Sequence, residues 1–242
     1  MSRPPARRPG GPSSAAPLPP YLLRRSRRAR RITVRVDTDR GLIVTIPARG
    51  TVAEAERALR ELDGWIAPRL AALQDRRRRA AQDAAAGLPY LGTVLAVAAE
   101  AGRTRVRRDG DRLLVPADPA ERARALEAWY RTRARAESAP RLDAAAARLG
   151  VAYDRLRITD TRTRWGSCSS RGTISLSWRL LLAPVACLDY VVWHEACHLV
   201  HPHHGPTFWA LLREHVPDLD EPSGWLRRHG ADLRLLLPPA AG

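Results

Sequence analysis

A five-residue segment of this 242-residue chain has the residue types and the spacing to hold a metal ion and to activate water. The segment is His194-Glu195-Ala196-Cys197-His198, a His-Glu-x-x-His pattern. On an α-helix, residues four apart lie about 40° from each other around the axis, so both imidazoles face the same way. Two imidazole nitrogens placed in this way suit one tetrahedral zinc ion, and the adjacent Glu195 can take a proton from water. The pattern therefore predicts a zinc hydrolase with Glu195 as its catalytic carboxylate.

A catalytic zinc needs a third protein ligand and an open fourth position. The candidates that follow the pattern are His201, His203, His204 and Glu214. His201 shares the helical face but lies too far along the helix axis to join the first two imidazoles. His204 follows a proline, and its spacing of ten residues from His194 equals that of the third ligand in the pattern HExxHxxGxxH. We expect His204 to be the third ligand, with His203 and Glu214 as alternatives.

A second motif lies upstream, where Arg164-Trp165-Gly166-Ser167-Cys168 precedes a predicted strand. Arg164 could stabilise an oxyanion or anchor a carboxylate or phosphate, and Ser167 is a second candidate for substrate binding. Cys168 as a nucleophile paired with a histidine is a rival interpretation, but the metal pattern explains more residues. We expect the strand Thr173–Leu182 to form the sheet edge beside the active-site helix, where an extended peptide could add by main-chain hydrogen bonds.

These motifs occur together in a known order. A β-hairpin ending at Pro47 and a helix carrying Trp65 come first, followed by the RWGSC segment, the HExxH pattern and a His-x3-Phe-Trp segment that begins at His204. Over roughly residues 24–225 the chain resembles the YgjP-like metallopeptidase family, whose zinc-binding region is similar to that of SprT and WLM peptidases. The resemblance implies zinc binding by His194, His198 and His204 and catalysis by Glu195.

Periodicity and turn residues predict an α+β fold. Alternating apolar residues predict a β-hairpin over 32–46 and further strands in 88–116, at 155–159 and at 173–182. Helical periodicity predicts helices over 51–73, 118–149, 185–200 and 206–216. The expected order is a disordered basic Pro/Arg-rich leader (1–23), an N-terminal β-hairpin/helix/β region (24–116), a zincin-like metallopeptidase domain (117–230) and a C-terminal tail (231–242).

Composition limits the class of protein. Hydrophobic residues make up 45% of the chain and charged residues 27%, values typical of globular domains. An uncharged apolar run of about 18 residues is absent, which argues against a transmembrane helix, and the basic N-terminus lacks the apolar region of a signal peptide. Three cysteines without a CxxC pair fit a reducing compartment. We therefore expect a cytoplasmic protein.

Charge adds an expectation about partners. The net charge is +16, and ten arginines but no acidic residue lie within residues 1–35. Such a leader predicts weak, salt-dependent contact with nucleic acid. The main hypothesis is hydrolysis of a peptide or protein substrate. One alternative, which the resemblance to the YgjP-like family also implies, is a metal-dependent pyrophosphohydrolase acting on a nucleotide such as UTP. The other is a nucleic-acid-binding protein with a structural zinc.

Overall fold

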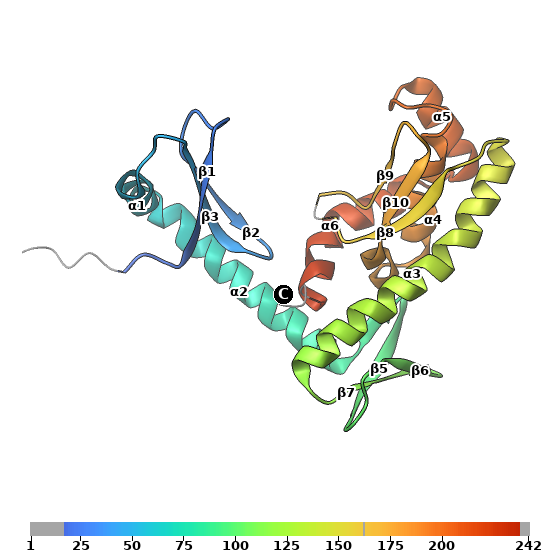
Figure 1. Cartoon of the computed structure of the whole chain (residues 1–242), viewed down its shortest axis with the longest axis horizontal. Helices are drawn as coiled ribbons and strands as arrows, with labels where there is room; N and C mark the ends of the chain where they lie inside the picture. The colour runs from blue at the N-terminus through green and yellow to red at the C-terminus, as the bar shows by residue number, and fades with distance from the viewer. Residues whose placement is uncertain (1–16, 162, 238–242) are drawn as a thin grey trace, which may run out of the picture. The chain divides into compact units, whose positions relative to one another are not determined.

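The computed structural model describes residues 17–161 and 163–237, and its architecture mixes helices with sheets as expected (Figure 1). The chain divides into two compact units, of which the first ends at Leu73 and the second begins at Gln74. Most of the expected leader falls on residues 1–16, outside the described residues. The boundary that we expected at residue 116 lies within the second unit.

The first unit contains a three-stranded sheet in the order β1-β3-β2. The predicted hairpin is present as β2 (Thr33–Asp37) and β3 (Gly41–Pro47), which pair antiparallel. The structure adds β1 (Tyr21–Ser26), whose first residues we had assigned to the leader and which pairs parallel with β3. Alternate residues of β1 pack against the apolar core of the unit. This burial stabilises the strand, although prolines precede it and it contains two arginines.

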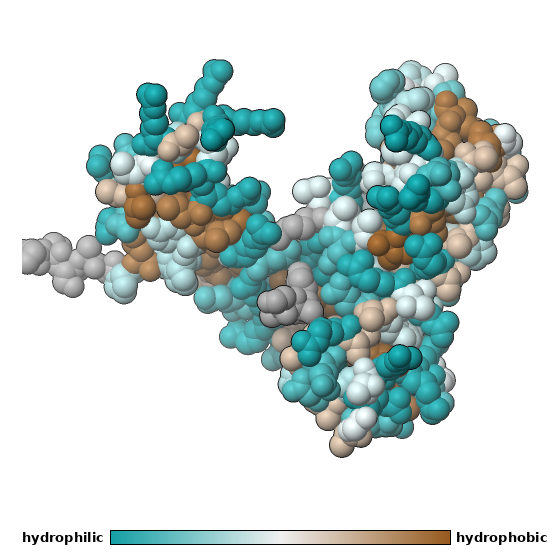
Figure 2. Space-filling view, viewed as in Figure 1, coloured by the Kyte–Doolittle hydropathy of each residue, from teal (hydrophilic) through white to brown (hydrophobic). Residues whose placement is uncertain are grey.

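Arginines dominate the exposed part of this unit. Figure 2 shows long hydrophilic side chains that project from the first unit. The segment that runs from β1 to β2 contributes six exposed arginines without an intervening acid: Arg24, Arg25, Arg27, Arg28, Arg30 and Arg31. Such a segment is costly to bury, so it lies at the surface while the apolar residues of the strands form the core.

Two helices replace the single helix predicted over residues 51–73. They are α1 (Val52–Glu61) and α2 (Asp63–Ala86), and the chain leaves helical geometry between them at Leu62. The predicted capping box at the start of α1 is confirmed, because the Glu54 amide donates to the Thr51 hydroxyl over 3.2 Å and the Thr51 amide donates to the Glu54 carboxylate over 2.8 Å. Ala55 and Leu59 of α1 are buried in the core of the unit.

The second unit begins with a four-stranded sheet in the order β4-β5-β7-β6. Its strands are β4 (Leu88–Tyr90), β5 (Thr93–Glu100), β6 (Arg107–Asp109) and β7 (Arg112–Pro116). The long helix α3 (Pro119–Leu149) follows, with Asp118 as its N-cap and Gly150 at φ +66° as its C-cap. α3 packs against β7, β8 (Arg155–Thr159) and α4 (Val185–Cys197).

A second three-stranded sheet lies in the same unit, in the order β8-β10-β9. The strand that we expected over Thr173–Leu182 is shorter: β10 (Thr173–Ser177) is followed by the 3-10 helix η1 (Trp178–Leu182). All five residues of η1 are buried, so they lack the alternation of a strand, and the Ser177 hydroxyl accepts from the Arg179 amide at the turn. The expectation that this strand forms the sheet edge was also wrong, because β10 lies between β8 and β9 (Gly166–Cys168).

Three helices complete the second unit: α4 (Val185–Cys197), α5 (Pro206–His215) and α6 (Asp220–Leu236). α4 lies against β9, β10 and α3, and its apolar residues belong to the large core of the unit. α6 was not predicted, and it includes residues that we had assigned to a C-terminal tail. Within the described residues, none of the helices combines the length and apolar character that crossing a membrane requires.

Candidate metal centre and active site

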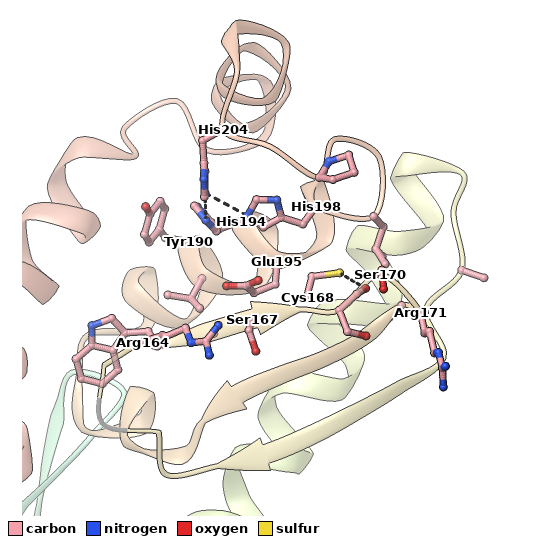
Figure 3. Close-up of a pocket in the computed structure, with 18 residues that line it drawn as sticks. Arg164, Ser167, Cys168, Ser170, Arg171, Tyr190, His194, Glu195, His198 and His204 are labelled. Atoms are coloured by element: carbon pink, nitrogen blue, oxygen red, sulfur yellow. Dashed lines mark hydrogen bonds between the residues drawn. The ribbon is translucent and has the colours of Figure 1, made fainter. Parts of the chain in front are cut away.

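Three imidazoles converge at the C-terminal end of α4 (Figure 3). The Nε2 atom of His204 lies 2.9 Å from that of His194 and 3.1 Å from that of His198. His194 lies on α4, His198 caps the end of this helix, and His204 lies on the loop that leads to α5. The structure therefore brings His204, the histidine that we expect to be the third ligand, together with His194 and His198.

The spacing of these nitrogens fits a shared cation. Each Nε2 carries either one proton or one lone pair, so His204 can hydrogen-bond to only one of its two neighbours. Three nitrogens bound at about 2.0–2.1 Å to one tetrahedral ion would also lie close together, and all three could then present a lone pair. The three residues can therefore hold one metal ion of the kind that prefers imidazole.

Neighbouring groups orient two of the three rings. The Nδ1 atom of His198 donates to the carbonyl oxygen of His201 over 3.1 Å, which leaves Nε2 of the neutral ring with its lone pair. The indole of Trp209 donates to the carbonyl oxygen of His204 over 3.2 Å, and the two rings stack with centroids 5.5 Å apart. Phe208 packs against all three imidazoles. These contacts fix the directions in which the nitrogens point.

The electrostatics also favour the neutral forms of His194 and His198. Burial, together with the positive charges that His198 and His204 would carry, lowers the pKa of His194 to about 4. Burial likewise lowers the pKa of His198. A neutral imidazole is the form that binds a metal ion, so the site is prepared for one at neutral pH.

Glu195 lies beside this centre and is nearly buried, with 5% of its surface exposed. The backbone N–H of Cys168 donates to its carboxylate, while Oε2 has no hydrogen-bond partner within the described residues. Burial raises the pKa of Glu195 to about 7, although the Arg164 guanidinium and the Cys168 amide act in the opposite direction. A carboxylate with this pKa can both accept and return a proton near neutral pH.

Gly166 allows Glu195 to reach this position. A Cβ atom on Gly166 would lie 2.5 Å from Oε1 of Glu195 and 2.6 Å from its Cγ, which is closer than real Cβ contacts. The glycine therefore lets the edge strand β9 approach α4 closely enough for the hydrogen bond at Cys168. The sequence motif identified this segment, but it did not show that the site requires glycine at position 166.

A cleft of about 900 Å³ runs past the histidines and is lined by β9 and by the loops on both sides of it. Arg164 and Ser167, which we had named as candidates for substrate binding, both line this cleft. In Figure 3 Arg164 extends below Glu195, whereas the Ser167 side chain points to the opposite side of the strand from Cys168. Arg171 adds a second guanidinium, which the sequence analysis did not identify.

The other expected candidates lie outside the cluster of imidazoles. His201 contributes its carbonyl oxygen, and His203 is exposed. Glu214 is an exposed residue of α5. Cys197 is fully buried among apolar residues of α4 and α5. Tyr190, four residues before His194 on the same face of α4, lines the cleft and was missed although its spacing could have revealed it.

A buried ion pair supports the segment that carries Arg164. The Arg179 guanidinium, with 1% of its side chain exposed, donates to both oxygens of Asp160 over 2.7 and 2.9 Å. Arg179 also donates to the carbonyl oxygen of Leu237 over 2.5 Å, and Arg234 of α6 donates to the carbonyl oxygen of Thr161. Bidentate contacts of this kind hold the start of the segment against α6.

Comparison with known proteins adds the following findings. A profile of the family described as YgjP-like, metallopeptidase domain, matches residues 30–229. Among solved structures, the crystal structure of the metallopeptidase zymogen of Pyrococcus abyssi abylysin is similar to part of the chain. This similarity has 21% sequence identity and a TM-score of 0.33, and it covers 38% of this chain and 93% of the other. A comparison with curated proteins found no match to the chain.

Proposed function

The chain belongs to the YgjP-like metallopeptidase family, and from this premise we propose that it is a zinc-dependent peptidase with its active site at His194, Glu195, His198 and His204. The observation that carries the proposal is the approach of three Nε2 atoms to one point beside a nearly buried carboxylate. Three imidazoles with an open fourth position are typical of catalytic rather than structural zinc, which argues against the nucleic-acid-binding alternative.

The metal supplies one part of the chemistry. A zinc ion bound by the three histidines would lower the pKa of a water molecule and polarise a substrate carbonyl. His198 is held for this role by the carbonyl oxygen of His201, and His204 by Trp209. The His201 contact is made at Nδ1 of His198, and Trp209 contacts the main-chain carbonyl and the ring face of His204, so neither support competes for an Nε2 atom.

Glu195 performs the proton transfers. Its carboxylate takes a proton from the attacking water and then returns it to the amine that leaves when the peptide bond breaks. The raised pKa supports both steps, because the group is neither a strong acid nor permanently ionised near neutral pH. Arg164 lies close enough to lower this pKa and is suited to stabilise negative charge on the reacting carbonyl.

The outer edge of β9 is the proposed binding site for the peptide backbone. Trp165 and Ser169 direct main-chain groups toward β10, since the Ser177 amide donates to Trp165 and the Ser169 amide donates to Thr173. Backbone groups alternate in direction along a strand, so those of Gly166 and Cys168 point toward the cleft. An extended peptide could pair with the carbonyl groups of this edge, which replaces β10 in our earlier expectation.

The test is Glu195→Gln in zinc-loaded protein, assayed on an unstructured protein and on UTP. We expect proteolysis to fall by about 100-fold or more while bound zinc stays at the wild-type level. Glu214→Gln, an exposed carboxylate on α5, is the matched control and should remain active. Wild-type activity in the Glu195 variant would refute the mechanism, and turnover of UTP without proteolysis would favour the pyrophosphohydrolase.

A further inference from the structure

A second pocket of about 470 Å³ lies beside the metal cleft. Its walls are aromatic and consist of Trp165, Tyr190 and Trp209. Trp165 and Tyr190 also line the cleft that contains the histidines, so the two cavities share a wall. A substrate bound in the cleft would therefore have the second pocket within reach of one of its side chains.

The aromatic walls have fixed positions relative to the metal centre. Trp165 packs on Gly230 of α6, where a Cβ atom would lie 2.6 Å from the indole ring. Trp209 is hydrogen-bonded to His204 through its indole and stacks on the imidazole. Tyr190 lies one helical turn before His194, and the centroids of these two rings are 5.8 Å apart. The pocket is therefore built onto the residues that would hold the metal.

The rest of the pocket has an apolar floor and a polar rim. Leu219 and Leu226, which are 4% and 5% exposed, contribute the floor. Arg213, Asp220 and Arg227 line the pocket and are exposed. A pocket with apolar walls and a floor between polar rim residues suits the burial of one large apolar side chain whose backbone stays at the mouth.

We propose that this pocket binds one large apolar or aromatic side chain of the peptide substrate, at a position next to the cleaved bond. The inference rests on the proposed peptidase function and adds the class of substrate to it. Continuity with the cleft through Trp165 and Tyr190 identifies the occupant as part of the same peptide. Burial of a Leu or Phe side chain in place of Ala favours binding by about tenfold or more.

The first experiment measures cleavage of a peptide library by the zinc-loaded protein. We expect a preference of about tenfold or more for Leu, Phe or Tyr over Ala at one position that flanks the cleaved bond. Ser223→Trp would fill the pocket from α6 and should shift this preference toward small residues. Arg228→Trp places the same side chain on an exposed position of α6 that does not line the pocket, and it should keep the wild-type preference.

The second experiment measures binding without turnover. Calorimetry with zinc-loaded Glu195→Gln should give a Kd about tenfold or more lower for a peptide with Phe at the preferred position than for the Ala peptide. Two results would overturn the pocket assignment but not the proposed peptidase function. One is cleavage without a side-chain preference at either position that flanks the cleaved bond. The other is a preference that stays unchanged in a folded Ser223→Trp variant. Absence of any proteolysis by the wild type refutes the proposed function, and equal affinities for the Phe and Ala peptides then overturn the pocket assignment as well.

Discussion

The two units of the molecule contain the same small sheet with different chemistry beside it. In the first unit β1 pairs parallel and β2 antiparallel with the central strand β3. In the second unit β8 pairs parallel and β9 antiparallel with the central strand β10. In both, the last strand in sequence lies in the middle and is followed by a helix, α1 in one case and α4 after η1 in the other.

The difference lies in the side chains at the edge strand and on the helix. β2 presents Val34 and Val36 to an apolar core, and the face of α1 that packs on it contributes Ala55 and Leu59. β9 presents Gly166, and α4 brings Glu195 against it. The comparison shows that the topology of the sheet does not determine function, because the same arrangement serves as a plain core in one unit and as a candidate active site in the other.

The largest expected effect is the loss of metal binding in His204→Ala. Only two imidazoles would remain. Loss of a group that supports a metal ligand lowers metal affinity by up to about 100-fold, so loss of a ligand itself should lower the zinc affinity by more than this. Zinc titration against a competing chelator measures this. His203→Ala, an exposed neighbour, should bind zinc normally. Equal zinc affinities of His204→Ala and His203→Ala would mean that there is no metal site of the proposed kind beside the second sheet.

The next prediction compares how much an ion pair contributes to the stability of each unit. Asp160→Ala leaves the buried Arg179 guanidinium without its carboxylate and should destabilise the second unit by about 3–5 kcal/mol. Glu56→Ala removes an exposed i,i+4 pair of α1 and should cost about 0.3–0.5 kcal/mol. Urea unfolding followed by tryptophan fluorescence compares the variants. Losses of equal size would contradict the distinction between a buried and an exposed pair.

The pKa of Asp160 predicts how the stability difference between wild type and Asp160→Ala depends on pH. Burial raises the pKa of Asp160, but the hydrogen bonds and charge of Arg179 outweigh it and bring the pKa below the ordinary value of 3.8. The ion pair therefore stabilises the folded chain fully above pH 3.8, and its contribution disappears as the pH falls through the lower folded pKa. The gap between wild type and Asp160→Ala should stay constant from neutral pH to pH 5 and narrow only in stronger acid.

Gly166→Ala tests the close approach that distinguishes β9 from β2. The added methyl group would displace Glu195, and a shift of this kind costs about 100-fold in kcat. Zinc content should not change, because the histidines are untouched. Gly64→Ala in the first unit, where a Cβ atom would meet nothing within 4 Å, is the control. A fully active Gly166→Ala protein would show that the site tolerates a wider gap.

The last prediction concerns the helix cap of the first unit. Thr51→Ala removes the capping box of α1 and should destabilise that unit by about 1 kcal/mol. Hydrogen exchange of the amides of Val52–Glu61 should become faster, while zinc affinity and proteolysis stay at wild-type values. A change in zinc affinity would show that the two units are energetically coupled.

The features that the sequence predicted well depend on short-range geometry. The spacing of His194, His198 and His204 contains the turn of one helix and the bend after it, and the capping box at Thr51 involves neighbours three residues apart. The hairpin of β2 and β3 and the helix α3 likewise follow from local periodicity. Such features were predictable because nothing distant in the chain is needed to form them.

The features that escaped prediction depend on tertiary contacts. Gly166 and Glu195 are far apart in sequence, and their approach follows from the packing of α4 on the sheet. The order of strands places β10 in the centre, which its apolar pattern does not specify. β1 forms because β3 and the helices provide a core for its apolar side chains, a context that its own short, Arg-containing sequence does not reveal.

The hydrogen bond from the Cys168 amide to Glu195 connects the edge strand β9 to the proposed catalytic carboxylate. Under the proposed function, the strand that would align the peptide also holds the proton-transfer group, so a change in one disturbs the other. Mutations in this strand should therefore rarely alter substrate selectivity while leaving turnover intact. New selectivity would have to arise where no such link exists, at side chains that contact the substrate but not the base.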